Sequence, residues 1–165
     1  MNIYAIQVKT GSEEAFIKRF HNTHVSFDNY IFHFPQRCLT ERKSGKINKV
    51  NKPVFDGYVF VQTDGVDLYL FRQTQGFIRF LPAKTCGIPL QGKDLVIVSH
   101  FIKNKGVSKV RFDENNRIVV LEGVLAGLEG NIVKVDKRKG RAKIKLDLYD
   151  DSFTIDLAFE VIGAA

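Results

Sequence analysis

A cluster of basic side chains between residues 134 and 145 is the part of this sequence best suited to bind a ligand. Seven of these twelve residues are Lys or Arg, and Asp136 is the only acid among them. The pattern predicts a turn at 137–140, followed by a strand whose alternate side chains share one face. Turn and face together could neutralise several phosphates of a nucleic acid and release its counterions. The residues predicted to bind RNA are Lys134, Lys137, Arg138, Lys139, Arg141, Lys143 and Lys145.

A solvated strand face is the alternative interpretation of this basic cluster. The density of positive charge, with the acids placed elsewhere, favours binding. Because no row of aromatic residues accompanies the charges, we expect recognition of a folded RNA and not of a stacked single strand. A second basic segment is predicted as a projecting hairpin with its turn at 43–46. Its candidate nucleic-acid contacts are Arg42, Lys43, Lys46 and Lys49, and a flexible loop without function is equally compatible with the pattern.

Enzymatic chemistry finds no support in the sequence. There is no GxSxG, phosphate-binding loop or HExxH motif, and the glycines at 123–130 do not open a helix. His21 and His24 lie three residues apart without a patterned cysteine or carboxylate nearby. Cys38 and Cys86 are far apart and show no ligand spacing. The sequence therefore predicts a binding protein with no catalytic residue, metal or cofactor.

The composition is that of an ordinary globular protein, and its positive net charge indicates an acidic binding partner. The chain has 165 residues and a formal net charge of +7. Residues 1–104 carry a balance of +6 and residues 105–165 a balance of +1, so the C-terminal charge is segregated and not absent. No segment has the pattern of a signal peptide or the length of a membrane span. We expect a monomeric cytoplasmic protein that does not bind membranes, with both cysteines reduced.

The N-terminal part predicts an α+β sandwich, an antiparallel sheet flanked by helices. Ser12 is predicted as the N-cap of its first helix, which ends at about His21. A second helix is expected from residue 64 or 65 to about 74, and a third over 92–104. The expected strands cover 3–8, 31–42 with 47–50, 58–62 and 77–81.

The C-terminal part predicts a small five-stranded β-barrel after a linker at 105–116. Strands are expected at 117–122, 130–136, 141–148, 152–157 and 160–162. Gly123, Gly127 and Gly130 would permit the positive φ angles of a tight corner. The predicted organisation is a first domain at 1–104, the linker, and a second domain at 117–165.

Four short segments carry a resemblance to a known family. They read YAIQ at 4–7, FDGYVFVQ at 55–62, GFI at 76–78 and GVLAGLEGNIVKVD at 123–136. In this order they resemble the bacterial NusG transcription elongation factors, which join an N-terminal NGN domain to a C-terminal KOW barrel. The resemblance covers nearly the whole chain.

This resemblance implies an NGN domain that grips the clamp helices of RNA polymerase through an apolar pocket and limits pausing. The matching positions of that pocket are Tyr4, Val54, Phe55, Tyr58 and Phe60. We expect Phe55 and Tyr58 to belong to an exposed aromatic cluster, since aromatic anchors dominate many interfaces. For Phe60 the alternative is packing within the sheet. Asp56 departs from the family, which usually has a proline there.

Within the family the chain is most similar to specialised paralogs, the antiterminator LoaP among them. The segment DKRKGRAKI at 136–144 carries this likeness, which implies processive antitermination with a KOW domain bound to a leader RNA hairpin. The basic hairpin at 42–49 could then meet DNA of the elongation complex, or the polymerase. KOW domains of the family also recruit ribosomal protein S-ten or Rho through apolar residues. Here the matching residues are Leu125, Leu128 and Tyr149, for which barrel packing is the alternative.

Two other function classes stay open at this point. Small KOW barrels also occur in ribosome-associated and translational RNA-binding proteins, although the NGN-like half argues against that class. A structural adaptor that binds neither RNA nor polymerase is the third reading.

Overall fold

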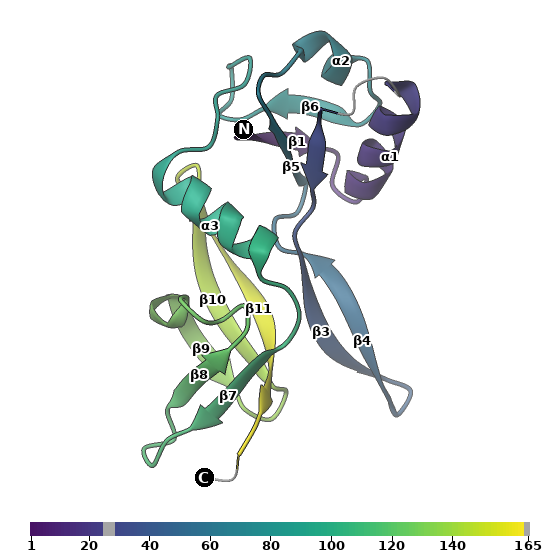
Figure 1. Ribbon diagram of the computed structural model, residues 1–165. Coiled ribbons are helices and arrows are strands. Elements are labelled where there is room, and N and C mark those ends of the chain that lie inside the picture. The colour runs from purple at the N-terminus through teal and green to yellow at the C-terminus, as the bar shows by residue number, and fades with distance from the viewer. Residues whose placement is uncertain (25–28, 164–165) are drawn as a thin grey trace. The chain divides into compact units, whose positions relative to one another are not determined.

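The computed structural model describes residues 1–24 and 29–163, in two compact units (Figure 1). Unit 1 comprises Met1–Pro35 and Phe55–Val98, and unit 2 comprises Gln36–Val54 and Ser99–Ala165. The last two residues of the predicted second domain, 164–165, lie outside the described residues. Unit 2 thus takes one segment, 36–54, from the middle of the predicted first domain.

Unit 1 is an antiparallel four-stranded sheet with helices, as the sequence predicts. Its strand order is β2-β5-β1-β6. The strands are β1 (Asn2–Val8), β2 (Ile31–His33), β5 (Tyr58–Thr63) and β6 (Phe77–Phe80), and the helices are α1 (Glu13–Thr23) and α2 (Leu68–Arg72). The second helix is shorter than predicted because Asp67 caps it: its side chain accepts a hydrogen bond from the backbone N–H of Tyr69 at 3.1 Å.

Aromatic side chains fill the core of unit 1. Phe20 of α1 lies 4.8 Å from Phe71 of α2 between ring centroids and 5.4 Å from Tyr30. On the sheet, alternate residues of β1 and β5 face these rings, since successive strand residues point to opposite faces. The core cluster consists of Tyr4, Ile6, Val8, Phe16, Phe20, Tyr30, Val59, Val61, Leu70, Phe71 and Phe80. The four phenylalanines of this cluster, together with Tyr4 and Tyr30, therefore hold the helices on one face of the sheet.

Unit 2 contains a curled five-stranded sheet in the order β8-β7-β11-β10-β9. Its strands are β7 (Ser108–Phe112), β8 (Ile118–Glu122), β9 (Ile132–Asp136), β10 (Arg141–Leu148) and β11 (Asp151–Val161), with a short 3-10 helix, η1 (Glu129–Asn131). The β7–β11 pair is parallel and the other pairs are antiparallel. The predicted α+β fold with a small five-stranded C-terminal barrel is confirmed. Helix α3 (Gly92–Lys103) has residues in both units.

Two details of the barrel differ from the prediction. The predicted strands at 152–157 and 160–162 are one strand, β11, because no turn residue interrupts the run at Ala158 and Phe159, which are both buried. The fifth strand is β7, inside the range expected to be a linker. Its burial alternates from Ser108 to Phe112 along five residues, and the short polar flanks obscured this pattern in the sequence.

The segment 36–54 forms a long hairpin of β3 (Gln36–Lys43) and β4 (Lys46–Pro53). The predicted hairpin and its turn are confirmed, but the run predicted at 31–42 divides into β2 and β3, and the return limb predicted at 47–50 is longer, at 46–53. Ser44 and Gly45 occupy the turn with φ angles of 54° and 77°. The hairpin belongs to unit 2 because β3 packs against β11 of the barrel.

The hairpin β10–β11 has ends of opposite charge. At one end lies the basic turn at 137–140, and at the other lies the turn at 149–150, flanked by Asp147 and Asp151. Tyr149 and Asp150 of the acidic turn both have positive φ angles, 50° and 66°. This tight two-residue turn keeps the eight cross-strand pairs from Arg141 to Leu148 in register.

Candidate functional site

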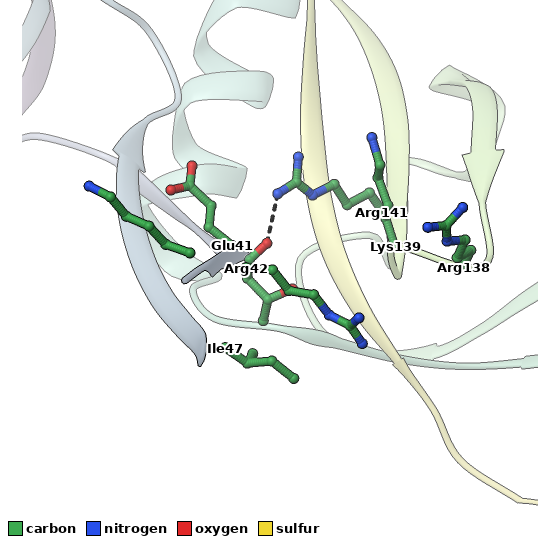
Figure 2. Close-up of a pocket in the computed structure, with 8 residues that line it drawn as sticks. Glu41, Arg42, Ile47, Arg138, Lys139 and Arg141 are labelled. Carbon is green, nitrogen blue, oxygen red and sulfur yellow. Dashed lines mark hydrogen bonds between the residues drawn. The ribbon is translucent and has the colours of Figure 1, made fainter. Parts of the chain in front are cut away.

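A basic pocket lies between the β3–β4 hairpin and the turn that joins β9 to β10 (Figure 2). Its volume is about 710 Å³, within the range of about 300–1,000 Å³ typical of ligand sites. Five of its eight lining residues are Arg or Lys, and one is an acid. The lining residues are Thr40, Glu41, Arg42, Lys43, Ile47, Arg138, Lys139 and Arg141. The structure thus brings together two basic segments that the sequence presents as separate candidates.

Arg141 joins the two walls of this pocket. Its Nη2 donates a hydrogen bond to the backbone carbonyl of Thr40 at 2.7 Å, across 101 residues of sequence. Figure 2 shows its side chain extending from β10 towards the hairpin. The Nε of Arg141 is buried and has no hydrogen-bond partner among the described residues. This half-buried side chain, bonded to a backbone carbonyl of the hairpin, is part of the framework of the pocket, which the sequence did not predict.

A second arginine holds the base of the hairpin. The Nη1 of Arg37 donates to the backbone carbonyl of Asp156 in β11 at 2.8 Å, and its Nε donates to the carbonyl of Pro53 in β4 at 3.2 Å. One side chain therefore contacts β4 and β11 together. Hydrogen bonds from charged donors are the stronger ones in proteins, so the hairpin and barrel are well connected.

The turn at 137–140 has a fixed geometry. The carboxylate of Asp136 accepts a hydrogen bond from the backbone N–H of Lys139 at 2.9 Å. That hydrogen bond, more than any other influence, lowers the pKa of Asp136 below its ordinary value. Gly140 closes the turn with a φ of 67°. The side chains of Arg138 and Lys139 are exposed and line the pocket.

Lys137 faces a different direction from its neighbours. Its Nζ donates to Oδ1 of Asn116 at 2.8 Å and lies 4.3 Å from the centroid of the Phe112 ring. Both contacts are with the loop and strand before β8. Lys137 does not line the pocket, so its part in nucleic-acid binding stays a prediction.

The other predicted RNA-binding residues lie on the outer face of the barrel. On β10, burial alternates: Ala142, Ile144 and the next alternate residues face the core, and the basic residues face out, as predicted. Lys143 is paired in register with Lys134 on one side and with Asp156 on the other. Lys145 is exposed. The basic surface is therefore not continuous: Asp156 stands within it, and Arg141 is turned towards the hairpin.

The basic hairpin also divides into two parts. Arg42 and Lys43 line the pocket, whereas Lys46 and Lys49 are exposed on β4 outside it. Glu41, the only acid of the lining, forms an ion pair with Lys52 at 3.1 Å. The negative charge of Glu41 is therefore compensated within the hairpin by Lys52.

The predicted polymerase contacts do not form one exposed aromatic cluster. Tyr4 and Phe60 are buried on opposite faces of the sheet, since Tyr4 pairs with Val61 and Ala5 pairs with Phe60. Phe55 packs edge-on against Phe60 with ring centroids 5.5 Å apart. Val54 and Phe55 are also buried, and of the five residues Tyr58 alone is partly exposed. The expected exposed aromatic cluster is therefore absent among these five residues. In its place, one half-buried tyrosine, Tyr58, lies on the face opposite the helices.

Glu13 fixes the loop that precedes Tyr58. Its buried carboxylate accepts hydrogen bonds from the backbone N–H of Gly57 at 2.8 Å and of Gly11 at about 3.1 Å. Ser12 stands at the N-cap of α1, as predicted, but makes no side-chain capping bond. From its position in the sequence alone, Glu13 is an acid in the first turn of α1. Its contact with a loop 44 residues away could not be inferred from local pattern.

The apolar residues predicted to recruit a protein partner lie mostly in the barrel core. Leu125 and Leu128 are buried, so packing is the role that the structure assigns to them. The backbone N–H of Leu125 is bonded to Oγ of Ser108 at 2.9 Å. Tyr149 is partly buried in the acidic turn.

Among residues 1–24 and 29–163, no group of three His, Cys, Asp or Glu side chains could hold a metal ion. Within the same residues, no helix is both long and apolar enough to cross a membrane. His24 and His100 are instead bonded to backbone carbonyls, of Leu70 at 3.1 Å and of Val124 at 2.6 Å.

Comparisons with known proteins agree with this architecture. Residues 1–117 match the family described as "Transcription termination factor nusG". The chain is 26% identical to the transcription termination/antitermination protein NusG of Bacillus subtilis, over 78% of this chain and 76% of that protein. It is 24% identical to the NusG of Campylobacter jejuni, over 96% of this chain and 94% of that protein.

A solved structure extends the likeness to the fold. The structure described as "Domain interaction in Thermotoga maritima NusG" superposes with a TM-score of 0.55 at 15% identity. The superposition covers 95% of this chain and 93% of that chain. Together with the family match over residues 1–117, which is well over half of the sequence, these findings show that the chain belongs to the NusG family.

Proposed function

We propose that this protein is a transcription termination/antitermination factor that binds RNA polymerase through unit 1 and RNA through unit 2. The observation that carries the proposal is the family match over residues 1–117, supported by relatives that bear that description. The protein acts in the cytoplasm by binding and not by catalysis. Its specialised role is processive antitermination, as in the paralogs that it resembles.

The polymerase contact is proposed at the sheet face opposite α1 and α2. Phe55 and Phe60 form a rigid apolar base there, and Tyr58 is the partly exposed residue beside them. Asp56 and Gly57 form the loop that Glu13 holds in place. A partly exposed tyrosine offers both apolar area and a polar hydroxyl to a partner helix, here the clamp helices of the polymerase.

The substitution Tyr58→Ala should weaken binding to purified bacterial RNA polymerase by tenfold or more, as expected for an aromatic anchor worth about 2 kcal/mol. Tyr69→Ala is the matched control, because Tyr69 is 66% exposed and lies on α2 in the same unit. The measurement is the dissociation constant by biolayer interferometry with immobilised polymerase. Equal affinity of wild type and Tyr58→Ala would contradict this contact, and co-purification with ribosomal subunits in place of polymerase would contradict the function class.

The RNA contact is proposed at the exposed basic residues of unit 2, with Arg138 and Lys139 foremost. They project from a turn held by Asp136 and Gly140, so their positions are defined before any ligand binds. Lys134, Lys143 and Lys145 on the outer barrel face extend the contact. The Arg138→Ala/Lys139→Ala variant should lose most of its affinity for an RNA hairpin in a mobility-shift experiment at low salt.

The activity itself is tested by transcription in vitro through an intrinsic terminator. Adding the protein should increase readthrough on a template that carries its own leader sequence. Readthrough should return to the basal level when the leader is deleted or when Arg138 and Lys139 are replaced by Ala. Unchanged readthrough in all reactions would refute the antitermination role.

A further inference from the structure

The basic pocket has two walls that come from distant parts of the chain. Arg42 and Lys43 stand at the end of β3, and Arg138 and Lys139 stand in the turn before β10. All four side chains are exposed. None of them forms an ion pair with another described residue. Four cations that face one cavity repel each other, and an anion placed between them removes that repulsion.

The connection between the walls fixes their spacing. Arg141 donates a hydrogen bond to the Thr40 carbonyl at 2.7 Å. Thr40 lies two residues before Arg42 on one wall, and Arg141 lies two residues after Lys139 on the other. Arg37 bonds β11 at the other end of the hairpin. Because both anchors bind main-chain carbonyls, they position the backbone of the hairpin and leave the wall side chains available. A ligand that contacts both walls therefore does not have to order the hairpin first, which lowers the entropic cost of binding.

The lining indicates what class of ligand fits. Multiple exposed cations, a volume of about 710 Å³ and the lack of an aromatic side chain suit phosphate groups and do not suit stacked bases. Ile47, which is 66% exposed, is the apolar lining residue and could contact a ribose. Glu41 is paired with Lys52 and leaves the lining with a strong positive excess.

We propose that the hairpin β3–β4 and the barrel turn form a single phosphate-binding groove, in which one strand of the RNA backbone lies between Arg42/Lys43 and Arg138/Lys139. This inference rests on the proposed function, since it specifies the RNA site of unit 2. It assigns half of that site to residues of the N-terminal family region. Arg141 is a positioning residue, because its hydrogen bond to the Thr40 carbonyl connects the two walls.

The test measures the salt dependence of binding to an RNA hairpin of arbitrary sequence, because phosphate contacts carry no sequence information. Full-length wild type is compared with Arg42→Ala/Lys43→Ala, with Arg138→Ala/Lys139→Ala and with the quadruple variant. Each double variant should reduce the slope of log K against log salt by about two, and the quadruple variant by about four. Lys103→Ala/Lys105→Ala is the matched control: it removes the same charge from two exposed positions of unit 2 outside the pocket, and it should leave the salt slope unchanged.

The outcomes separate this inference from the function on which it rests. Arg42→Ala/Lys43→Ala could bind RNA as the control does while Arg138→Ala/Lys139→Ala loses affinity. That result overturns the groove and leaves the RNA contact of the barrel in place. Wild-type binding by both double variants overturns the groove together with the turn contact, and absence of RNA binding by the wild type refutes the RNA-binding function as well. A DNA duplex of the same sequence that binds with equal affinity and the same dependence on both walls overturns the assignment to RNA. Thermal unfolding of each variant, expected to match wild type, excludes loss of fold as the cause.

Discussion

Lys137, Arg138 and Lys139 are consecutive in the chain, yet their side chains have different surroundings. Lys137 lies over the Phe112 ring and bonds Asn116, whereas Arg138 and Lys139 line the pocket. The difference arises from the turn, in which each residue points in a new direction. The three residues have the same charge, but their contacts indicate different roles.

Lys137→Ala should lower the free energy of unfolding by about 0.5–1 kcal/mol, the usual contribution of an exposed cation–π contact. The same substitution should change the salt slope of RNA binding less than Lys139→Ala does. Urea denaturation and salt-dependent mobility shifts on both variants check the two parts. A larger binding defect in Lys137→Ala than in Lys139→Ala would show that Lys137 leaves the ring to contact RNA.

The stability of the basic turn should depend on pH through the carboxyl group of Asp136. The folded state lowers the pKa of this carboxyl below its ordinary value of 3.8, chiefly through the hydrogen bond from the Lys139 N–H. The carboxylate therefore stabilises the turn at all pH values above about 3.8, and this contribution is lost as the pH falls through the lowered pKa. The amide resonance of Lys139 should shift with that transition in an NMR titration. In Asp136→Asn the transition should be absent.

At the scale of elements, Gly123 shows how one residue sets a barrel corner. Its φ is 105°, and a Cβ there would lie 2.6 Å from Cα of Ser108 and 2.8 Å from Oγ. Backbone atoms of β7 cannot move aside easily, and Oγ of Ser108 also holds the N–H of Leu125. The crossing between β7 and the segment after β8 therefore requires glycine at this position.

Gly123→Ala should destabilise the protein by at least about 1–3 kcal/mol from backbone strain, with overpacking against Ser108 in addition. Gly130→Ala is the control, because no heavy atom lies within 4 Å of a Cβ at that glycine. Chemical denaturation of the two variants gives the comparison. Equal stabilities would contradict the close approach.

The elements with strong periodicity could be predicted from the sequence, and those defined by distant contacts could not. The alternation on β10 and the turn at Lys43–Lys46 follow from local pattern. β7 is short and lies between polar segments, and its identity as a strand depends on parallel pairing with β11. The burial of Phe55 likewise depends on Phe60 and its surroundings, which no local rule contains. The site was predicted as two basic segments, and their proximity became visible only through Arg141 and Thr40.

At the scale of the whole molecule, the packing units do not follow the chain order. The hairpin at 36–54 is continuous in sequence with unit 1 and packs with the barrel in unit 2. β3 packs against β11, and Arg37 and Arg141 donate hydrogen bonds between the hairpin and the barrel. The region of family similarity, 1–117, thus spans both units.

Arg37→Ala should loosen the hairpin, since it removes the bonds to Pro53 and Asp156. We expect a loss of about 1–3 kcal/mol for these half-buried charged donors. Limited trypsin digestion should cleave the segment 42–49 faster in the variant than in wild type, as followed by mass spectrometry. Unchanged cleavage would indicate that other contacts hold the hairpin.

The opposite charges at the two ends of the β10–β11 hairpin make it an electric dipole. Its ends lie roughly 25 Å apart, the length of eight strand residues at about 3.3 Å each. In the field of a polyanion such a dipole experiences a torque that turns the basic turn forward and the acidic turn away. Correctly oriented encounters then become more frequent, so salt should slow association more than it speeds dissociation. The aspartates at the far end would contribute to the speed of recognition without touching the nucleic acid.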